Sequence, residues 1–372
     1  MNRVNFVIFC LMFFAVSFGV SAMAALVPSI ARYFNVSGES ALKLTWLYML
    51  PYGIVALLWS PLTRLVKIKS LFLITAFGFF LSSLLFSLSQ SINQAFIFRF
   101  LMGVFGCSFV PLSLIAIAKT VSGKNKAKYI GIFFTCSYIS TLVSVFLSGL
   151  LPWRVIYLIP ALLGLTAFIL IFKYLDSFDF RKEKFKISYH KTFKDKQAVR
   201  FFLVIIVASF LYHALQQRLG LYLSSRYALD QTTISLIFTV SILSAVCFEF
   251  WGGFLSSKIG SIKVVKAGFI VMSVFALGLL FVSQYQLIFL IILFWGSGWA
   301  LTHVGLSSHL AHFPDKILRD SSSLNSALRF SFGGLGAVFG GVLVETLGFN
   351  ILFIAVGLGV LFLGINTHKI II

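Results

Sequence analysis

Twelve apolar runs, each about twenty residues long, dominate the sequence and are separated by mostly short polar joins. A helix needs roughly 20 apolar residues to cross about 30 Å of hydrocarbon. The 372-residue chain is 59% hydrophobic and only 11% charged, and a soluble domain could not cover so many apolar side chains with polar surface. The sequence therefore predicts an all-α integral membrane protein.

The predicted membrane spans fall into two sets of six. They cover residues 5–31, 43–62, 70–89, 93–118, 128–151, 154–175, 199–223, 231–254, 264–283, 286–309, 321–344 and 349–367. One join is long and strongly basic, at residues 176–198. We therefore expect an N-terminal six-helix bundle at 1–175, a basic cytoplasmic linker at 176–198 and a C-terminal six-helix bundle at 199–372.

The basic residues test this map, because cytoplasmic loops of membrane proteins carry an excess of Lys and Arg. With a cytoplasmic N-terminus, 23 of the 30 basic residues fall on the inner side and five on the outer side. The outer five are Arg32, Lys43, Arg154, Arg218 and Arg226, while Arg99 and Arg329 lie inside spans. The pattern predicts a multi-pass protein of the cell membrane, inner or plasma, with both termini in the cytoplasm.

The net charge of +20 follows from the same sidedness, since basic loops meet an anionic cytoplasmic leaflet. We expect membrane lipids and not nucleic acid as the partner of these charges. The four cysteines lie inside apolar runs and form no CxxC pair or other metal-ligand spacing. The sequence therefore predicts no metal site and no cofactor.

The two halves repeat each other at an offset of about 192 to 194 residues. Gly106 in the fourth span matches Gly298 in the tenth, and residues 148–151 match residues 340–343. Glycine and turn positions recur while the polar residues differ, which is typical of duplication followed by specialisation. The two predicted bundles are therefore pseudo-symmetric.

Three motifs support a family resemblance. The fourth span reads Arg-x-x-x-Gly-x-x-Gly from Arg99 through Gly103 to Gly106. The loop after the eighth span carries Gly253, Ser257, Lys258 and Gly260, and its first-half counterpart keeps Arg64 and Lys67. Pro152-Trp153-Arg154 precedes the sixth span. With the six-plus-six topology, the whole chain resembles the major facilitator superfamily, in particular its bacterial drug and metabolite efflux members.

The resemblance implies a secondary transporter that works by alternating access, and not an enzyme. It implies a small-molecule substrate, protons as a coupling ion and a monomeric protein. Arg64, Lys67, Lys258 and the motif glycines would act in gating and helix packing. Gly333, Gly336 and Gly340 form a further stripe in the eleventh span, which we expect to slide against the other half.

Ionisable groups inside spans are costly and are therefore functional candidates. The predicted substrate or proton pathway comprises Arg99, His213, Gln216, Gln217, Glu249, Trp299, His303 and Arg329. For Arg99 the alternative is a structural role, bonded to backbone carbonyls near a helix break. For Glu249 the alternative is simple pairing with Arg329 or a loop lysine.

These features favour proton-coupled efflux of a small organic compound. The first-half loop motif lacks its acidic residue, so proton coupling would have to use Glu249 or a histidine. The buried positive charge leaves a second interpretation open, a facilitator or exchanger of an organic anion or sugar. A non-transporting receptor and a membrane-embedded enzyme are the remote alternatives.

Overall fold

The fold consists of helices in two compact units. The structure is a computed structural model and describes residues 2–63, 65–121, 125–175, 189–310, 313 and 315–371. The chain divides into unit 1, Met1–Lys186, and unit 2, Ile187–Ile372. Within the described residues, twelve helices are long and apolar enough to cross a membrane, which confirms the predicted number of spans.

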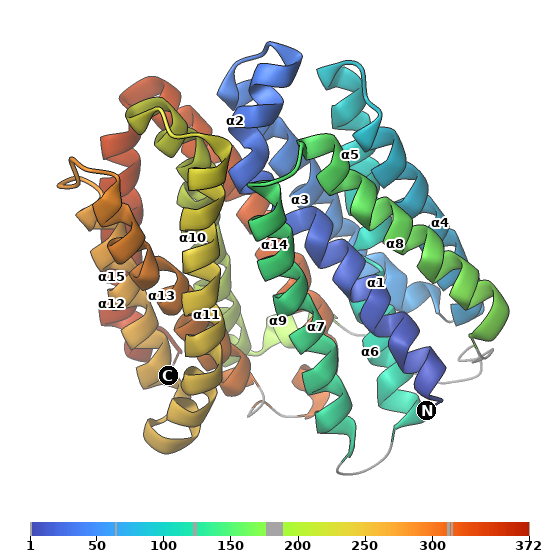
Figure 1. Ribbon diagram of the computed structural model, residues 1–372. Helices are drawn as coiled ribbons and strands as arrows, with labels where there is room; N and C mark the ends of the chain where they lie inside the picture. Colours follow the sequence, from blue (N-terminus) through green and yellow to red (C-terminus); the bar gives the residue numbers. More distant parts are fainter. Residues whose placement is uncertain are drawn as a thin grey trace. The chain divides into compact units, whose positions relative to one another are not determined.

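Unit 1 contains the first six spans (Figure 1). Its helices are α1 (Arg3–Ser21), α2 (Met23–Phe34), α3 (Gly38–Leu62), α4 (Ile68–Ser87), α5 (Ile92–Gly106), α6 (Phe109–Thr120), α7 (Asn125–Ser148) and α8 (Trp153–Tyr174). The predicted first and fourth spans are each divided into two helices. In the fourth span Pro111 has no N–H for the carbonyl of Cys107, so the hydrogen-bond ladder is interrupted between α5 and α6.

Unit 2 contains the last six spans (Figure 1). Its helices are α9 (Tyr189–Lys194), α10 (Lys196–Tyr227), α11 (Gln231–Ile259), α12 (Ser261–Gly278), α13 (Gln286–Leu310), α14 (Asp315–Leu347) and α15 (Phe349–Ile371). The short α9 and the first residues of α10 lie in the segment predicted as a linker. The carboxyl of Asp230 caps α11 by accepting from the backbone N–H of Thr233 at 2.9 Å, and this bonding lowers its pKa below the ordinary value.

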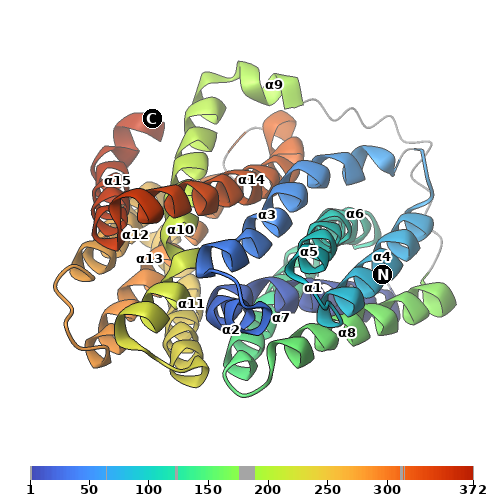
Figure 2. The same cartoon turned by 90° about the horizontal axis from the view of Figure 1, so that it is seen from above.

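The same helix pairs form in both units. The pairs α3–α5, α4–α5, α1–α7, α4–α8 and α1–α8 of unit 1 correspond to α11–α13, α12–α13, α10–α14, α12–α15 and α10–α15 of unit 2. In Figure 2, which views the helices from above, α7 lies beside α1 in unit 1, and α14 crosses α10 in unit 2. The internal repeat read from the sequence is therefore also a repeat of packing.

Small residues bring the paired helices close together at backbone carbonyls. In unit 1 the hydroxyls of Ser140 and Ser144 on α7 donate to the carbonyls of Phe14 and Phe18 on α1, each at 2.6 Å. The partners lie 126 residues apart in the chain. Spans one and five are thereby fixed to each other by side-chain-to-backbone hydrogen bonds.

Unit 2 uses glycine at the corresponding contacts. Gly336 and Gly340 on α14 lie against the backbone carbonyls of Phe210 and Ala214 on α10, again at a separation of 126 residues. We expected this stripe, with the buried Gly333, to face the other half of the protein. That expectation is wrong for Gly336 and Gly340, because their close neighbours belong to the same unit.

A second pair of equivalent contacts joins span two to span four in unit 1 and span eight to span ten in unit 2. Gly103 on α5 lies against the carbonyl of Tyr48, and Gly296 on α13 lies against the carbonyl of Ser241. Gly106 packs at 3.2 Å, measured from an ideal Cβ position, against the hydroxyl of Tyr48. Gly103 and Gly106 therefore serve helix packing inside unit 1.

The remaining motif residues lie at the ends of helices. Gly260 has φ +95° between α11 and α12, a conformation that favours glycine. Lys67 is exposed at the N-terminal cap of α4, and the Nζ of Lys258 lies 5.9 Å from the ring centroid of Phe254. Gly253 meets only a loose contact, 3.9 Å from its ideal Cβ position to Val304. Arg64 lies outside the described residues, and the gating role of this set stays a prediction.

The packing predicts that Gly296→Ala lowers the thermal midpoint of the purified protein. The new methyl group would overlap the carbonyl oxygen of Ser241, and overpacking of this kind costs about 1–3 kcal/mol. Gly278→Ala is the matched control, since its nearest neighbour would be Ile291 at 4.0 Å. Equal midpoints for the two variants would contradict the close approach of α11 and α13.

Candidate functional site

Arg99 is buried inside unit 1, with only 1% of its surface exposed. Its Nη1–H donates to the carbonyl of Gly19 at 3.0 Å and its Nε–H to the carbonyl of Leu44 at 3.3 Å. The guanidinium carbon also lies 4.5 Å from the ring centroid of Tyr48 and 5.3 Å from that of Tyr157. Gly19 lies just before the interruption between α1 and α2, where its carbonyl needs a new donor.

This geometry differs from the cavity-facing position that the resemblance implied for Arg99. The side chain joins spans one, two and four from within the bundle, as in the structural alternative considered for it. A guanidinium suits this role because its several N–H donors can serve different carbonyls at once. Arg99 is therefore placed as a packing residue of unit 1.

Arg218 is a second buried arginine and lies in unit 2, where the sequence prediction counted it on the outer side of the membrane. It lies within α10, is 2% exposed and donates from Nη1 to the carbonyl of Ala337 on α14. Arg218 falls within the predicted span 199–223, close to its outer end, and the charge count therefore assigned it to the outer side.

Stacked aromatic rings form the centre of the candidate site, which is built from unit 2 alone. The ring of Tyr212 on α10 is nearly parallel to two indoles on α13, at 12° to Trp295 and 13° to Trp299. The ring centroids are 5.0 Å and 3.8 Å away from that of Tyr212. Trp295 and Trp299 are spaced by four residues, so they occupy adjacent turns of one face of α13.

Polar side chains of α10 surround these rings. The indole N–H of Trp295 donates to Oε1 of Gln216 at 2.6 Å. One turn earlier, Nδ1 of His213 pairs with Nε2 of Gln217 at 3.0 Å. The predicted residues Gln216, Gln217, His213 and Trp299 therefore lie in one neighbourhood with Trp295.

Arg329 approaches this neighbourhood from α14. Its guanidinium carbon is 5.8 Å from the ring centroid of Trp299, and its Nε–H donates to Oδ1 of Asn325 at 2.8 Å. It also lies near enough to His213 for the two to interact electrostatically. The bond to Asn325, one helical turn away, orients the guanidinium.

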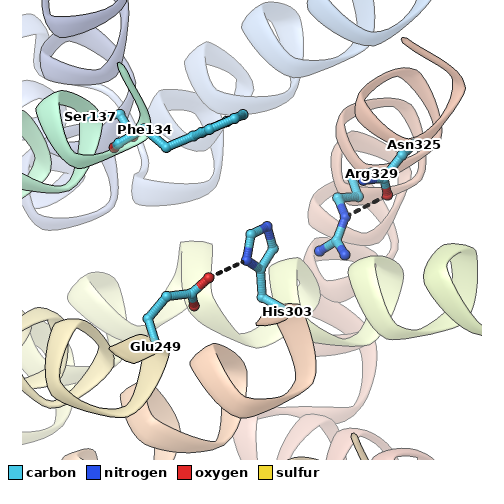
Figure 3. A network of polar contacts seen from close by, with 6 residues as sticks. All are labelled: Phe134, Ser137, Glu249, His303, Asn325 and Arg329. Atoms are coloured by element: carbon cyan, nitrogen blue, oxygen red, sulfur yellow. Dashed lines mark hydrogen bonds and ion pairs between the residues drawn. The ribbon is translucent and has the colours of Figure 1, made fainter. Parts of the chain in front are cut away.

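Glu249 and His303 form an ion-pair-competent contact between α11 and α13. Oε1 of Glu249 is 2.8 Å from Nδ1 of His303, and the side chains are 21% and 34% exposed. The expectation that Glu249 pairs with Arg329 or a loop lysine is wrong as to the partner. Figure 3 shows Glu249 and His303 facing each other, with Arg329 extending from α14 toward the same region.

The helix that carries Glu249 is longer than the predicted span. The predicted span ended at residue 254, which placed Glu249 near the cytoplasmic end. The helix α11 runs to Ile259, so Glu249 lies ten residues before its end, about 15 Å at 1.5 Å per residue. The pair with His303 is therefore within the apolar part of unit 2. Among the described residues, no group of three or more His, Cys, Asp or Glu could hold a metal ion.

Sequence reasoning found most members of this site but not its contacts. His303 continues the spacing of Trp295 and Trp299 by one further turn, so the face of α13 was readable. The stacking of Tyr212 on both indoles depends on how α10 and α13 are placed side by side. No sequence pattern specifies that placement.

Comparison with known proteins decides the family. The sequence model of the Major Facilitator Superfamily matches residues 9–341. The chain belongs to this superfamily. The superfamily consists of transporters and not of enzymes, and the twelve candidate spans agree with a multi-pass membrane protein of this family.

Curated relatives are distant and match only in part. The "Uncharacterized transporter C36.02c" of Schizosaccharomyces pombe is 26% identical over 165 residues, 43% of this chain and 29% of that protein. An "Uncharacterized protein" of Aquifex aeolicus is 26% identical over 217 residues, 56% of each chain. The matches therefore span between 29% and 56% of these relatives' own length.

Solved structures share the fold at low identity. The nucleoside transporter NupG has a TM-score of 0.79 at 14% identity, covering 99% of this chain and 100% of its own. A bacterial homologue of the human lysosomal transporter Spinster has a TM-score of 0.73 at 13% identity, covering 100% and 95%. The human organic anion transporter MFSD10 has a TM-score of 0.69 at 15% identity, covering 97% of each chain.

The buried position of Arg99 predicts that Arg99→Gln acts mainly on stability. The carbonyls of Gly19 and Leu44 would lose their donor, at a cost of about 1–3 kcal/mol for each group. The thermal midpoint should fall well below that of Arg226→Gln, a control at an exposed arginine of α10. A normal midpoint combined with lost substrate binding would instead support the cavity-facing role.

Proposed function

We propose that this protein is a proton-coupled secondary transporter of a small organic compound, with Glu249 and His303 as its proton site. The observation that carries the proposal is the 2.8 Å contact between the carboxylate and the imidazole inside the apolar part of unit 2. A carboxylate and an imidazole in such contact inside a span can hold or release one proton, as in the Asp, Glu and His relays of other transporters. In the sequence the two residues were separate candidates for proton binding, and in the structure they contact each other.

The surroundings favour His303 over His213 as the proton carrier. A cation on His303 would lie against the carboxylate of Glu249. The polar contact of His213 in the described part of the chain is with the neutral amide of Gln217 and not with a carboxylate. His213 instead orients Gln217 through its Nδ1 contact.

The substrate site of this proposal is the neighbourhood of the stacked rings. Tyr212 and Trp299 offer a flat apolar wall, while Gln216, Gln217 and Arg329 supply polar groups beside it. A few polar groups set into an aromatic surface are typical of sites for small molecules. Alternating access would expose this wall first to one side of the membrane and then to the other.

The sequence predicts efflux as the direction of transport. The residues on which that prediction rests make packing contacts in the structure. Arg99 bonds to carbonyls within unit 1. Arg154 donates from Nη2 to the hydroxyl of Tyr33 at 2.5 Å and to the carbonyl of Ser89 at 2.6 Å. These contacts explain both motifs by packing, so they give no separate argument for efflux, and transport assays must decide the direction.

The alternative is a facilitator or exchanger of an organic anion. The observation that favours it is the guanidinium of Arg329, 5.8 Å from the ring centroid of Trp299. We further propose, from the distribution of basic residues, that both termini face the cytoplasm. We also propose that the protein acts as a monomer in the cell membrane.

Flux measurements in liposomes test the proton site. A panel of compounds is first screened for those that raise the thermal midpoint, and these are then assayed with and without a pH gradient. Glu249→Gln and His303→Gln should remove most of the dependence of flux on the pH gradient, because each variant lacks one member of the pair that holds the proton. Exchange of labelled for unlabelled compound, which needs no net proton movement, should persist in both variants.

The matched control is Glu345→Gln, which removes an exposed carboxylate near the end of α14. It should leave gradient-driven flux unchanged. Flux in the unmodified protein that ignores the pH gradient would overturn the proton-coupled proposal and favour the facilitator or exchanger.

A further inference from the structure

Three ionisable side chains of unit 2 extend toward one region, from three different helices. They are Arg329 on α14, His303 on α13 and Glu249 on α11 (Figure 3). With neutral His303, the charges of Arg329 and Glu249 cancel. With one proton on the Glu249–His303 pair, the net charge of the three groups is +1.

The remaining titratable groups on the packed helices lie elsewhere. Of the acidic residues of unit 2, Glu249 falls well inside a candidate span of the described residues, since Asp195 and Asp230 precede α10 and α11, Asp315 and Asp320 precede the span that begins at Leu324, and Glu345 is close to the end of α14. Further titratable groups on the described helices of unit 2 include Tyr212, His213 and the buried Arg218 on α10, Cys247 and Lys258 on α11, Lys263 and Lys266 on α12 and His309 on α13. Lys258, Lys263 and Lys266 are exposed toward the helix ends, and Nδ1 of His309 lies 3.3 Å from the hydroxyl of Ser261.

The stacked rings of Tyr212 and Trp299 lie next to these ionisable groups. Trp299 is one helical turn from His303 on α13, and it is stacked on Tyr212 with a ring-centroid distance of 3.8 Å. The guanidinium of Arg329 lies near the same indole. Trp299 therefore has Tyr212 stacked on it and a cation over its ring, a combination that suits a ligand with a flat apolar body and an anionic group.

We propose that unit 2 binds an aromatic organic anion, and that the anion and a proton bind together. The carboxylate or similar group would lie by Arg329 and His303, and the ring would lie against Trp299. The proton part of this inference rests on the proposed proton site, while the anion part does not. Binding of a proton to the Glu249–His303 pair changes the net charge from 0 to +1 and so strengthens anion binding.

Linkage makes this coupling reciprocal. If a proton strengthens anion binding by some factor, the anion strengthens proton binding by the same factor. Substrate and proton would then cross the membrane in the same direction. This sense of coupling differs from the proton-exchanging efflux that the sequence patterns predicted.

Three probes with one ring system test the charge preference. They are 1-naphthoate, 1-naphthamide and 1-naphthylmethylammonium, with charges of −1, 0 and +1. Binding to the purified full-length protein is measured by calorimetry at about pH 6 and at about pH 8.5, where the naphthoate stays ionised. We expect naphthoate to bind most tightly, and about tenfold more tightly at the lower pH, a typical size for coupling between sites.

Variants separate the two parts of the proposal. Glu249→Gln removes the negative charge, so naphthoate should bind at about pH 8.5 as tightly as it binds the unmodified protein at about pH 6. This gain of affinity cannot arise from poor folding. Arg329→Gln should remove the preference for naphthoate over naphthamide at both pH values. Glu345→Gln should behave as the unmodified protein does.

Each outcome has a defined meaning. Equal binding of the three probes, or no binding of naphthoate, would overturn the anion site. A preference for naphthoate that does not change with pH, or with Glu249→Gln, would overturn the co-binding of the proton. Charge-selective binding together with flux that ignores a pH gradient would keep the anion site and reject the proposed proton coupling.

Discussion

Close approach of helix backbones is the constraint on which both units depend. In lipid, apolar surface gives helices little reason to associate, so they are held by small residues and by hydrogen bonds to carbonyls. Unit 1 places serine hydroxyls of α7 on the carbonyls of α1. Unit 2 places glycines of α14 on the carbonyls of α10 at the same chain separation. The repeat thus preserves the contact while the chemistry that makes it differs.

The arginines inside the spans make two kinds of contact. Arg99 in unit 1 and Arg218 in unit 2 bond to helix carbonyls and join neighbouring spans. Arg329 instead lies beside Trp299 and points toward His303 (Figure 3). An arginine inside a span is thus no sign of transport chemistry by itself. What distinguishes Arg329 is its position over the ring of Trp299, near a pair that can carry a proton.

Much of the fold could be predicted from the sequence because lipid demands long apolar runs. The twelve spans and their pairwise repeat followed from hydropathy and glycine spacing. Hydropathy does not show the interruption near Pro111, because the apolar run continues across this residue. The partner of Glu249 could not be predicted in this way. It lies 54 residues away on another helix, and many polar residues of unit 2 were equally available by sequence.

The contact between Glu249 and His303 has an electrical consequence. If the anion and the proton bind together, the empty site and the loaded site both have a net charge of zero. A charge that crosses the whole membrane gains or loses about 2.3 kcal/mol per 100 mV. Neither moving form of the site would feel this force. The transport cycle would then be electroneutral, and the pH difference between the two sides, and not the membrane voltage, would set how far the anion is accumulated.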